Sequence, residues 1–560
     1  MSASEAPETA DHVEVEWQFD ALDVRPVARW LEGFSSNSAK VSPSGEKEMS
    51  DVYLDTDDWR MFRAGYALRI REKGGEIEAT MKLVASSFDD DGGVKKRREI
   101  SESLSSNDPF ELPKSGGPVG ERVHALVGQK SIRTLFEVRT KRKTYEAAFD
   151  VDGAGGDGVD GEAASLAESV AATVAEVALD ETEIPVGDGA PAVLRRVEVE
   201  VESGTTDLVS PFVEELRRGC RLTPSTTSKF EAGLLASELS PPVEPDFGPT
   251  EVSSSMPVGE VAYAVMRGQF GKFLAHEPGT RIGEDSEELH DMRVTGRRLR
   301  AAMQIFKDAL PVRSKKLRDE LKWISGVLGE VRDLDVQLEQ LEEWISDAAP
   351  DDREPLGELR DVLEERRTKE RRAMLRALDS RRYAKFVETY SAFLVRGPAR
   401  RSEYARRTVR EVGPELITKR YRKFRKAGDV VEKGSPAEDY HELRKRGKRL
   451  RYALEFFSKI YGKPATDLTK SLKSLQDVLG DHQDAEVAMS QLRELALPAK
   501  ERRGGAVSPR TVFVMGGISH RYETLVGELR EEFPPAYSEV KGKRWKRLKN
   551  KMDKDRPGAE

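Results

Sequence analysis

Two short acidic patterns in the N-terminal half have the residue types and spacing of a metal-binding site. Glu14-Val-Glu16 and Glu198-Val-Glu200 each carry two carboxylates two positions apart, so both side chains of a pair point to one face of a β-strand. Carboxylate oxygens are ligands that hard divalent cations prefer. Basic side chains on other alternating segments could hold phosphate oxygens. These basic residues are Arg69, Arg71, Lys82, Arg97 and Arg142. Together the two sets are the parts of a metal-dependent phosphoryl site.

A second set of residues suited to binding lies in the C-terminal half and occurs twice, at an offset of 151 positions. The repeated positions are His290, Arg293, Arg297 and Arg300 in the first copy and His441, Arg444, Lys448 and Arg451 in the second. The segment that follows repeats at the same offset, since Gly329 and Asp333 match Gly480 and Asp484. One offset for both blocks indicates one duplicated unit.

The repeated motif predicts a helix with one basic face. Because each residue of a helix turns by about 100°, His290, Arg293, Arg297 and Arg300 fall within an arc of roughly 80°. Apolar residues such as Leu299 fall on the opposite side, which such a helix buries. A basic face on one helix is most often a solvated surface, and a lone histidine near a helix start is most often structural. Duplication of the whole stripe favours anion binding.

The chain length and composition predict several domains without a membrane segment. A chain of 560 residues exceeds what a single core usually organises, so two or three domains are expected. No apolar run approaches the roughly 20 residues that span a bilayer, and the acidic start lacks the features of a secretion signal. Cys220, the single cysteine, cannot form an internal disulfide and excludes cysteine-rich zinc sites. We therefore expect a soluble, cytoplasmic protein with no membrane insertion.

The net charge of −8 hides a strong asymmetry. Residues 1–250 carry 28 Lys and Arg against 48 Asp and Glu, whereas residues 251–560 carry 64 against 52. The C-terminal part is thus suited to a polyanion: nucleic acid, anionic lipid or polyphosphate. Single-strand binders generally stack bases on aromatic side chains, and Tyr452 is the one aromatic residue near a stripe. The pattern therefore favours polyphosphate over nucleic acid.

Periodicity separates a strand-rich half from a helical half. Residues 13–19 alternate strictly, with Trp17 and Phe19 on one face and acidic side chains on the other, as in a strand. The polar face is either a solvated outer surface or the lining of a barrel lumen. The Pro- and Ser-rich residues 239–256 predict a linker. After the linker, apolar residues recur with the helical period, which predicts eight to ten helices separated by prolines such as Pro355 and Pro414. The Gly- and Asp-rich residues 152–160 predict a surface loop.

Residues 12–235 resemble a CYTH domain, the triphosphate tunnel fold of class IV adenylyl cyclases, thiamine triphosphatases and inorganic triphosphatases. The matching positions are Glu14-x-Glu16, Tyr53-x-Asp55-Thr56, Leu68-Arg69-x-Arg71, Lys82, Arg97-x-Glu99, Arg142, Leu179-Asp180, Glu198-x-Glu200 and Ser228-Lys229. The resemblance implies an eight-stranded antiparallel barrel whose lumen binds a triphosphate with Mg²⁺ or Mn²⁺. It implies a metal side of Glu14, Glu16, Asp180, Glu198 and Glu200. It implies a triphosphate-binding set of Arg69, Arg71, Lys82, Arg97, Glu99, Arg142 and Lys229.

One position departs from the family pattern. The opening motif of the family is Glu-x-Glu-x-Lys, and this chain has Gln18 at the lysine position. A glutamine still donates a hydrogen bond to phosphate, but it removes a full charge, and charge-assisted hydrogen bonds are roughly twice as strong as neutral ones. Electrostatic catalysis would suffer more than binding. Whether the barrel is a metal-dependent triphosphatase therefore stays open, and no separate catalytic residue is expected.

The duplicated half is similar to a CHAD domain, the conserved-histidine α-helical domain. His290 and His441 match its histidines, and Arg293, Arg297, Arg300, Arg444, Lys448 and Arg451 match its basic positions. The resemblance implies two related helical bundles that bind inorganic polyphosphate in a basic groove between them. The expected domains are 12–238 for the CYTH-like barrel, 239–256 for the linker, 257–540 for the CHAD-like bundle and 541–560 for a basic tail.

These expectations combine into one function with two alternatives. The chain is expected to bind inorganic polyphosphate and to carry a tunnel that binds triphosphate, with or without metal-dependent hydrolysis. One alternative is a non-catalytic scaffold on polyphosphate granules with a degenerate tunnel. The other alternative is a protein that binds RNA 5′-triphosphate ends.

Overall fold

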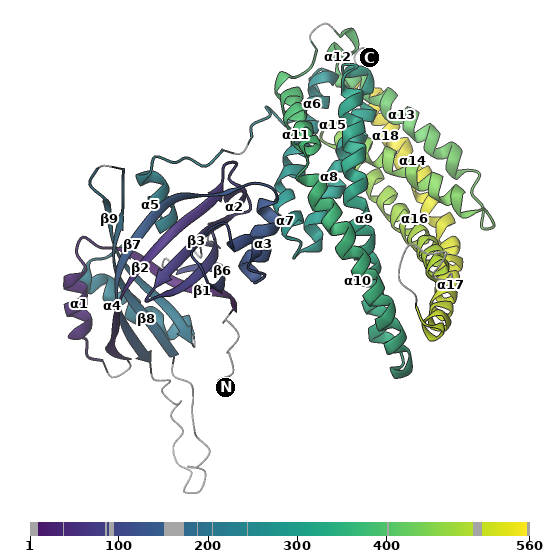
Figure 1. The fold of residues 1–560 in the computed structure, drawn as a ribbon. Helices are drawn as coiled ribbons and strands as arrows, with labels where there is room; N and C mark the ends of the chain where they lie inside the picture. The colour runs from purple at the N-terminus through teal and green to yellow at the C-terminus, as the bar shows by residue number, and fades with distance from the viewer. Residues whose placement is uncertain are drawn as a thin grey trace, which may run out of the picture. The chain divides into compact units, whose positions relative to one another are not determined.

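The computed structural model forms two compact units, Met1–Glu244 and Pro245–Glu560 (Figure 1). The structure describes residues 9–36, 39–84, 87–88, 94–149, 173–187, 189–203, 205–243, 245–399, 402–496 and 507–556. The loop predicted at residues 152–160 lies outside the described residues.

The first unit is a closed antiparallel barrel, as the sequence predicted. Eight long strands follow the order β1-β9-β8-β7-β2-β3-β4-β6, and β6 pairs with β1 to close the ring. Two-residue strands β5 and β10 pair with β6 and β1. The strands are β1 (Thr9–Asp20), β2 (Ala39–Thr56), β3 (Tyr66–Lys73), β4 (Glu76–Leu83), β5 (Ser87–Phe88), β6 (Val94–Leu104), β7 (Ile132–Phe149), β8 (Thr173–Ile184), β9 (Ala192–Ser203) and β10 (Thr223–Pro224).

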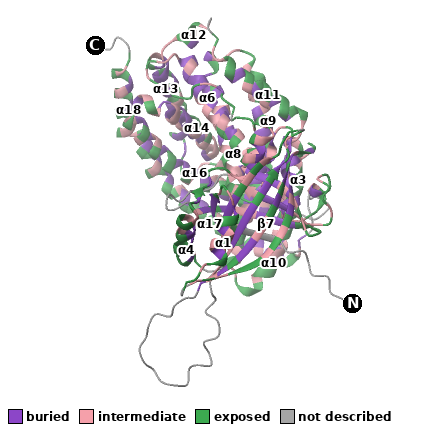
Figure 2. Ribbon diagram, turned by 90° about the vertical axis from the view of Figure 1, so that its left-hand side faces the viewer, coloured by how far each residue is buried: buried purple, intermediate pink, exposed green. Residues whose placement is uncertain are grey.

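The barrel has its polar side chains inside and an apolar layer outside. Trp17 and Phe19 of β1 are buried with Phe212 and Leu216, in a cluster that joins the outer face of the strands to two helices. Because successive strand residues alternate between faces, the acidic residues between them point into the lumen. Figure 2 shows buried and exposed stretches alternating along β7. The polar faces that the sequence left ambiguous therefore line the barrel.

The barrel unit also contains five α-helices among its described residues, of which α1 and α4 carry the outer apolar layer. These helices are α1 (Arg25–Glu32), α2 (Arg60–Arg63), α3 (Pro118–Val127), α4 (Thr206–Cys220) and α5 (Lys229–Ala236), with a short 3₁₀ helix at Leu112–Lys114. Helix α5 begins with a capping box, in which Ser228 accepts from the Glu231 backbone N–H and the Glu231 side chain accepts from the Ser228 N–H. This cap satisfies free donors at the helix start and positions the next residue, Lys229.

The second unit is all-helical and duplicated. Its first copy contains α6 (Val258–Ala275), α7 (Glu277–Ile282), α8 (Ser286–Ile305), a 3₁₀ helix (Lys307–Ala309), α9 (Ser314–Asp347), α10 (Pro350–Leu378) and α11 (Arg381–Arg396). After α12 (Glu403–Arg406), the second copy contains α13 (Val409–Gly428), α14 (Ala437–Phe456), α15 (Ser458–Tyr461), α16 (Lys463–Ala496), α17 (Pro509–Lys541) and α18 (Lys543–Lys554). One apolar core holds residues of both copies together.

The 151-residue offset holds in three dimensions. Helices α8 and α14 begin and end at positions that differ by 151. In the first copy Tyr390 of α11 stacks on Phe270 of α6, with ring centroids 4.6 Å apart. In the second copy Trp545 of α18 stacks on Tyr421 of α13 at 3.6 Å, and Tyr421 is the repeat of Phe270. Helix α18 thus occupies in the second copy the place that α11 has in the first.

The basic segment expected as a tail is this last helix. Leu548 and Met552 of α18 are buried in the core of the helical unit. Part of the predicted linker also belongs to the helical unit, because Phe247 packs on Phe270 with ring centroids 5.3 Å apart. The second part of the predicted linker therefore packs with the helical unit.

Two prolines that were predicted to separate helices lie inside them instead, so these two predictions were wrong. Pro355 and Pro414 lie inside α10 and α13, each as the sixth residue of its helix. A proline this close to a helix start removes few hydrogen bonds, because the first four N–H groups have no partner within the helix anyway. The described part of the helical unit also has more than the expected eight to ten helices, since short turns such as α7, α12 and α15 count separately. No helix among the described residues is long and apolar enough to cross a membrane.

Candidate functional site

The barrel encloses a charged cavity of about 280 Å³, called here the lumen cavity. Most of the residues implied by the resemblance line it, and they come from β1, β3, β4, β6, β7 and β9 and from the start of α5. The predicted residues in its lining are Glu14, Glu16, Arg69, Arg71, Lys82, Arg97, Glu99, Arg142, Glu198, Glu200 and Lys229. Asp180 is fully buried against two of these residues. The structure therefore brings the predicted tunnel residues together.

On one side of the lumen cavity, cations and carboxylates neutralise each other. Arg142 donates to both oxygens of Asp180 at 2.8 Å and also pairs with Glu198. Lys229 pairs with Asp180 and lies 3.0 Å from Glu198. Burial alone would raise the pKa of Glu198, but Lys229 and Arg142 hold this pKa well below its usual range. Asp180 and Glu198, which the resemblance placed on the metal side, thus lie against phosphate-side cations in the structure.

A second cation cluster centres on Lys82. Its ammonium group pairs with Glu14, and its nitrogen lies 3.5 Å from Glu16 and 3.4 Å from Glu99. Arg69 reaches Glu99 at 3.4 Å. Burial works against the charged form of Lys82, but these carboxylates raise its pKa above the usual value. Lys82 is therefore charged over the whole physiological pH range.

Arg71 pairs with a different carboxylate, Asp51, which was not among the predicted site residues. Its guanidinium donates to both oxygens of Asp51, at 2.7 and 3.0 Å. Burial opposes ionisation of Asp51, but Arg71 and Arg69 lower its pKa to about 2. Such bidentate pairing fixes the Arg71 side chain in orientation.

Glu200 is a lumen carboxylate without a neutralising partner among the described residues, whereas the nearby Glu14 and Glu16 share the Lys82 ammonium group. Glu200 lies opposite Glu16 in the β1–β9 register, and in the described part of the chain it has neither an ion pair nor a hydrogen bond from its side chain. Burial, together with Glu14 and Glu16, raises the pKa of Glu200 to about 8. Burial also raises the pKa of Glu14 to about 7, against the opposing effect of Lys82.

These three carboxylates have the chemistry that a hard divalent cation requires. No group of three or more His, Cys, Asp or Glu side chains among the described residues is already arranged as a metal site. Nevertheless, Glu14, Glu16 and Glu200 offer oxygen ligands whose mutual repulsion a cation would relieve. The donor set therefore has the oxygen chemistry of a site for a hard divalent cation.

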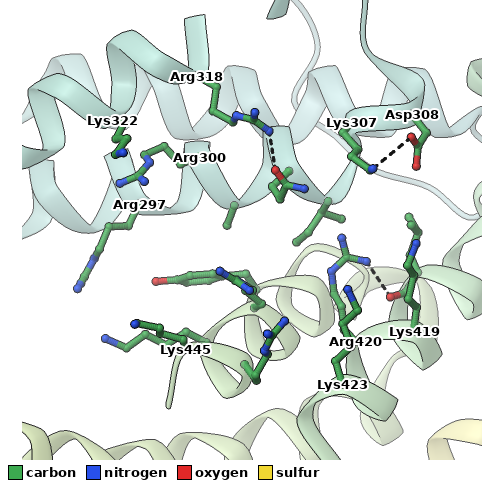
Figure 3. Close-up of a pocket in the computed structure, with 18 of the residues that line it drawn as sticks. Arg297, Arg300, Lys307, Asp308, Arg318, Lys322, Lys419, Arg420, Lys423 and Lys445 are labelled. Carbon is green, nitrogen blue, oxygen red and sulfur yellow. Dashed lines mark hydrogen bonds and ion pairs between the residues drawn. The ribbon is translucent and has the colours of Figure 1, made fainter. Parts of the chain in front are cut away.

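The helical unit contains a larger cavity of about 720 Å³, called here the basic groove. Its lining comes from both copies of the repeat. Figure 3 shows Arg297, Arg300, Arg318 and Lys322 on one side and Lys419, Arg420, Lys423 and Lys445 on the other. The remaining basic residues of the lining are Lys307, Arg446, Lys448 and Arg449, and its acidic residues are Asp308 and Asp319. A groove with so many cations attracts polyanions strongly.

Most cations of the basic groove are not neutralised by the protein. Lys307 faces Asp308 at 3.8 Å and Arg446 faces Glu442 at 2.6 Å. The other lining cations make no ion pair with any residue that the structure describes; Arg318 and Arg420 donate to the neutral acceptors Gln304 and the Leu416 carbonyl. Burial, with the charges of Arg444 and Arg297, lowers the pKa of Lys448 to about 7. Its twelve cations against two acidic residues thus give the groove an excess of positive charge.

The predicted stripe residues divide into two groups. Arg297, Arg300 and Lys448 line the basic groove. Arg293 instead pairs with Asp333 at 2.8 Å, Arg444 lies 3.7 Å from Asp484, and Arg451 lies 3.7 Å from Glu455. His290 and His441 are not part of the lining, and burial lowers the pKa of both imidazoles. Both histidines are therefore mainly neutral at pH 7.

The repeated aspartates contact the repeated arginines in the same way in both copies, since Arg293 pairs with Asp333 and Arg444 lies near Asp484. The repeated glycines lie beside these arginines: a Cβ atom on Gly329 would lie 3.7 Å from the Arg293 guanidinium, and one on Gly480 would lie 3.4 Å from that of Arg444. These are ordinary van der Waals distances, so the aspartates, and not the absence of a glycine side chain, orient the arginines.

The sequence reading missed the contribution of α13 and α9 to the groove. Lys419, Arg420 and Lys423 of α13 lie three and four positions apart, which places them on one helical face, and this spacing could have revealed them. Arg318 and Lys322 of α9 show the same four-residue spacing. Neither α9 nor α13 carries the repeated His-x-x-Arg motif, so their basic residues did not stand out against an Arg- and Lys-rich background.

Comparisons with known proteins agree with this architecture. The model of the CYTH domain matches residues 29–233, and the model of the CHAD domain matches residues 264–493. The CYTH match begins after Glu14, Glu16 and Gln18, although the structure places all three in the lumen. An uncharacterized protein of Mycobacterium tuberculosis, found in strains CDC 1551 and H37Rv, is 27% identical over 549 residues, covering 95% of this chain and 97% of that protein.

Solved structures are also similar to parts of the chain. The CHAD domain from the plant Ricinus communis is 24% identical, covers 55% of this chain and 96% of its own, and has a TM-score of 0.40. HpAC1 from Hippeastrum, an adenylyl cyclase candidate described as having a dominant triphosphatase activity, is 15% identical, covers 40% of this chain and 96% of its own, and has a TM-score of 0.28.

A closed barrel with a charged lumen, followed by a duplicated helical unit with a basic groove, defines a two-domain protein with one charged cavity in each domain. The chain belongs to the proteins in which a CYTH domain is followed by a CHAD domain.

Proposed function

We propose that the helical unit binds inorganic polyphosphate along the basic groove. The observation that carries this proposal is the lining of the groove, in which cations from both copies of the repeat face one cavity and mostly lack carboxylate partners. Buried or half-buried cations without partners are costly, and a linear chain of phosphates would supply closely spaced negative charges to all of them.

The groove fits a polymer of phosphates better than a nucleic acid. Tyr452 is the one aromatic residue in its lining, whereas single-strand binders stack successive bases on several aromatic side chains. A polyphosphate chain has charge but no bases, so it needs no stacking platform. RNA binding is therefore the competing outcome in the test.

The polyphosphate proposal is tested by equilibrium titration of the full chain with long-chain polyphosphate at several salt concentrations. We expect an affinity that falls steeply as salt rises, because each phosphate contact releases counterions. Replacing the lining residues Arg297, Lys423, Lys445 and Lys448 with Ala should weaken binding and flatten the salt dependence. Affinity that is equal in this variant and the parent, or tighter binding to RNA of equal charge, would contradict the proposal.

In the barrel, we propose that the lumen cavity binds a triphosphate together with a divalent cation, Mg²⁺ or Mn²⁺. Glu14, Glu16 and Glu200 would hold the cation, which when bound supplies charge neutralisation and polarises water or a phosphate oxygen. Arg142, Lys229 and Arg69 would hold phosphate oxygens. These cations now pair with carboxylates of the protein, so phosphate oxygens would have to compete with Asp180, Glu198 and Glu99.

The second part of this proposal is hydrolysis of inorganic triphosphate. The supporting observation is that the carboxylate set around Glu200 and the cation set around Arg142 line the same small cavity. Such a site can stabilise charge on a transferring phosphoryl group with groups already fixed in place.

Hydrolysis is tested by phosphate release from tripolyphosphate with Mg²⁺ or Mn²⁺. We expect release that requires the cation and is abolished in Glu198→Ala and Glu200→Gln. Tripolyphosphate binding without release would make the barrel a non-catalytic part of a polyphosphate scaffold. Tighter binding of a 5′-triphosphorylated RNA than of tripolyphosphate would favour the RNA alternative.

A further inference from the structure

A buried lysine, which is not part of the binding sites proposed above, lies next to Gln18. Lys95 of β6 is 3% exposed, and its ammonium group donates to the Gln18 side-chain oxygen and to the Ser225 carbonyl, both at 3.0 Å. Both acceptors are neutral. Lys95 makes no ion pair with any carboxylate among the described residues. Among the residues that the structure describes, the side chain is thus a buried cation without a carboxylate in ion-pair contact.

Two further buried cations lie near Lys95. Arg97 follows on the same face of β6, is 7% exposed, and its Nε is buried without a hydrogen-bond partner. Arg196 of β9 is 1% exposed; it lies 3.3 Å from Asp20 and 3.2 Å from Thr227, and its Nη1 is buried without a partner. Burial and the charges of Arg97 and Arg196 lower the pKa of Lys95, which agrees with their proximity.

This group differs from the other cations of the lumen. Arg142, Lys229, Lys82 and Arg69 each contact at least one carboxylate. Among Lys95, Arg97 and Arg196, by contrast, the described part of the chain gives an ion pair only to Arg196, with the half-exposed Asp20. Buried charges and buried N–H groups without partners carry large desolvation costs. An anion with several oxygen acceptors would remove this cost at all three side chains.

We propose that Lys95, Arg97 and Arg196 form an anion subsite beside Gln18, which takes one phosphate group of the bound triphosphate. Lys95 supplies there the positive charge that the neutral Gln18 lacks. This inference rests on the proposed function of the barrel and deepens it: the phosphate-binding set extends to two residues, Lys95 and Arg196, that the family pattern did not indicate. It also predicts that Gln18 does not by itself disable the tunnel.

The test uses the full chain with Arg297, Lys423, Lys445 and Lys448 replaced by Gln, so that phosphate binding reports on the barrel. Sodium phosphate and sodium tripolyphosphate are titrated separately by calorimetry. Lys95→Gln and Lys95→Met remove the buried charge, and Lys96→Gln removes a neighbouring charge whose side chain is exposed. Combining Gln18→Lys with Lys95→Gln moves the charge across the 3.0 Å hydrogen bond. Circular dichroism and the melting temperature check that each variant is folded.

We expect both Lys95 variants to bind each ligand about tenfold more weakly, which is the effect of losing one charged hydrogen bond. Lys96→Gln should bind like its parent, and the relocated charge should restore most of the affinity. Equal binding by the parent and both Lys95 variants, or no recovery in the folded double variant, would overturn the subsite. Lys95-dependent binding of sodium phosphate without binding of tripolyphosphate would overturn the triphosphate tunnel and leave the subsite standing.

Discussion

Arg297 on α8 and Lys448 on α14 are 151 positions apart in the sequence and line the same cavity. The two helices also meet directly, since Arg298 of α8 reaches Glu455 of α14 at 3.2 Å. The duplication therefore does not create two separate binding surfaces. It places equivalent stripes on facing helices, so that one polyanion can contact both copies.

The basic residues of α13 should matter as much as those of the repeated motif. Replacing Lys419 and Lys423 with Gln removes two lining cations that have no carboxylate partner. We expect about a tenfold loss of polyphosphate affinity and a shallower salt dependence, measured by titration at three salt concentrations. Lys369→Gln with Arg372→Gln on α10 removes equal charge outside the groove and should have little effect. Equal losses in the two variants would show that net charge, and not the groove, governs binding.

Polyphosphate binding should depend on pH through Lys448. Its pKa of about 7 in the free protein means that it is charged below pH 7 and loses its charge above. A bound polyanion favours the charged form and raises this pKa, so affinity should be greatest below pH 7 and fall as pH rises above it, by up to about tenfold per unit. Titration between pH 6 and 9 with long chains measures this slope. Lys448→Arg, which keeps its charge, should flatten it; an unchanged slope would contradict the role of Lys448.

Metal binding in the barrel should show the opposite dependence on pH. The pKa of Glu200 is raised to about 8 and that of Glu14 to about 7, and a divalent cation binds the deprotonated carboxylates. Affinity for Mg²⁺ should therefore rise as pH increases through 7 and 8 and level off above. Calorimetry in buffers of different ionisation enthalpy should detect released protons. Glu200→Gln should weaken binding and reduce proton release, whereas affinity independent of pH would exclude these carboxylates as ligands.

Helix α18 should be essential for the stability of the helical unit. Leu548 is fully buried, and Met552 is nearly so. Replacing either with Ala should lower the free energy of unfolding by about 2 to 5 kcal/mol, measured by denaturant unfolding of the full chain. Lys546→Gln with Lys549→Gln changes exposed charges of the same helix and should have little effect. An unchanged unfolding midpoint in Leu548→Ala would mean that α18 is a dispensable tail.

The strands and the paired helices could be predicted from patterns that are visible in the sequence itself. Strict alternation in β1 placed Trp17 and Phe19 on one face and Glu14 and Glu16 on the other, and the structure confirms a barrel with a polar lumen. The duplicated motif predicted paired helices, which α8 and α14 confirm. Alternation is a local property that predicts a strand and its two faces, whereas the closed barrel was implied by the resemblance to the CYTH family, and the pairing of helices by the 151-residue repeat.

The features that the sequence did not predict depend on contacts between residues far apart in the chain. Nothing local distinguishes Lys95 from Lys96, although pairing of β6 with β1 buries the first and exposes the second. The pairing of Asp180 with Arg142 likewise follows from β7 and β8 being neighbours. Pro355 resembled a helix boundary because its position relative to the helix start could not be known. The roles assigned to individual side chains in the tunnel and groove stay predictions.

The central claim, that the two copies build one polyphosphate site, is tested most directly by a double-mutant cycle on Arg297 and Lys448. Polyphosphate affinity is measured for the parent, Arg297→Gln, Lys448→Gln and the double variant of the full chain. If one polymer contacts both side chains in one groove, each single variant weakens binding. The loss in the double variant then differs from the sum of the two single losses, because the charge of Arg297 lowers the pKa of Lys448 and the two side chains therefore act on one another. Unchanged affinity in the single variants, or losses that are strictly additive, would contradict the claim.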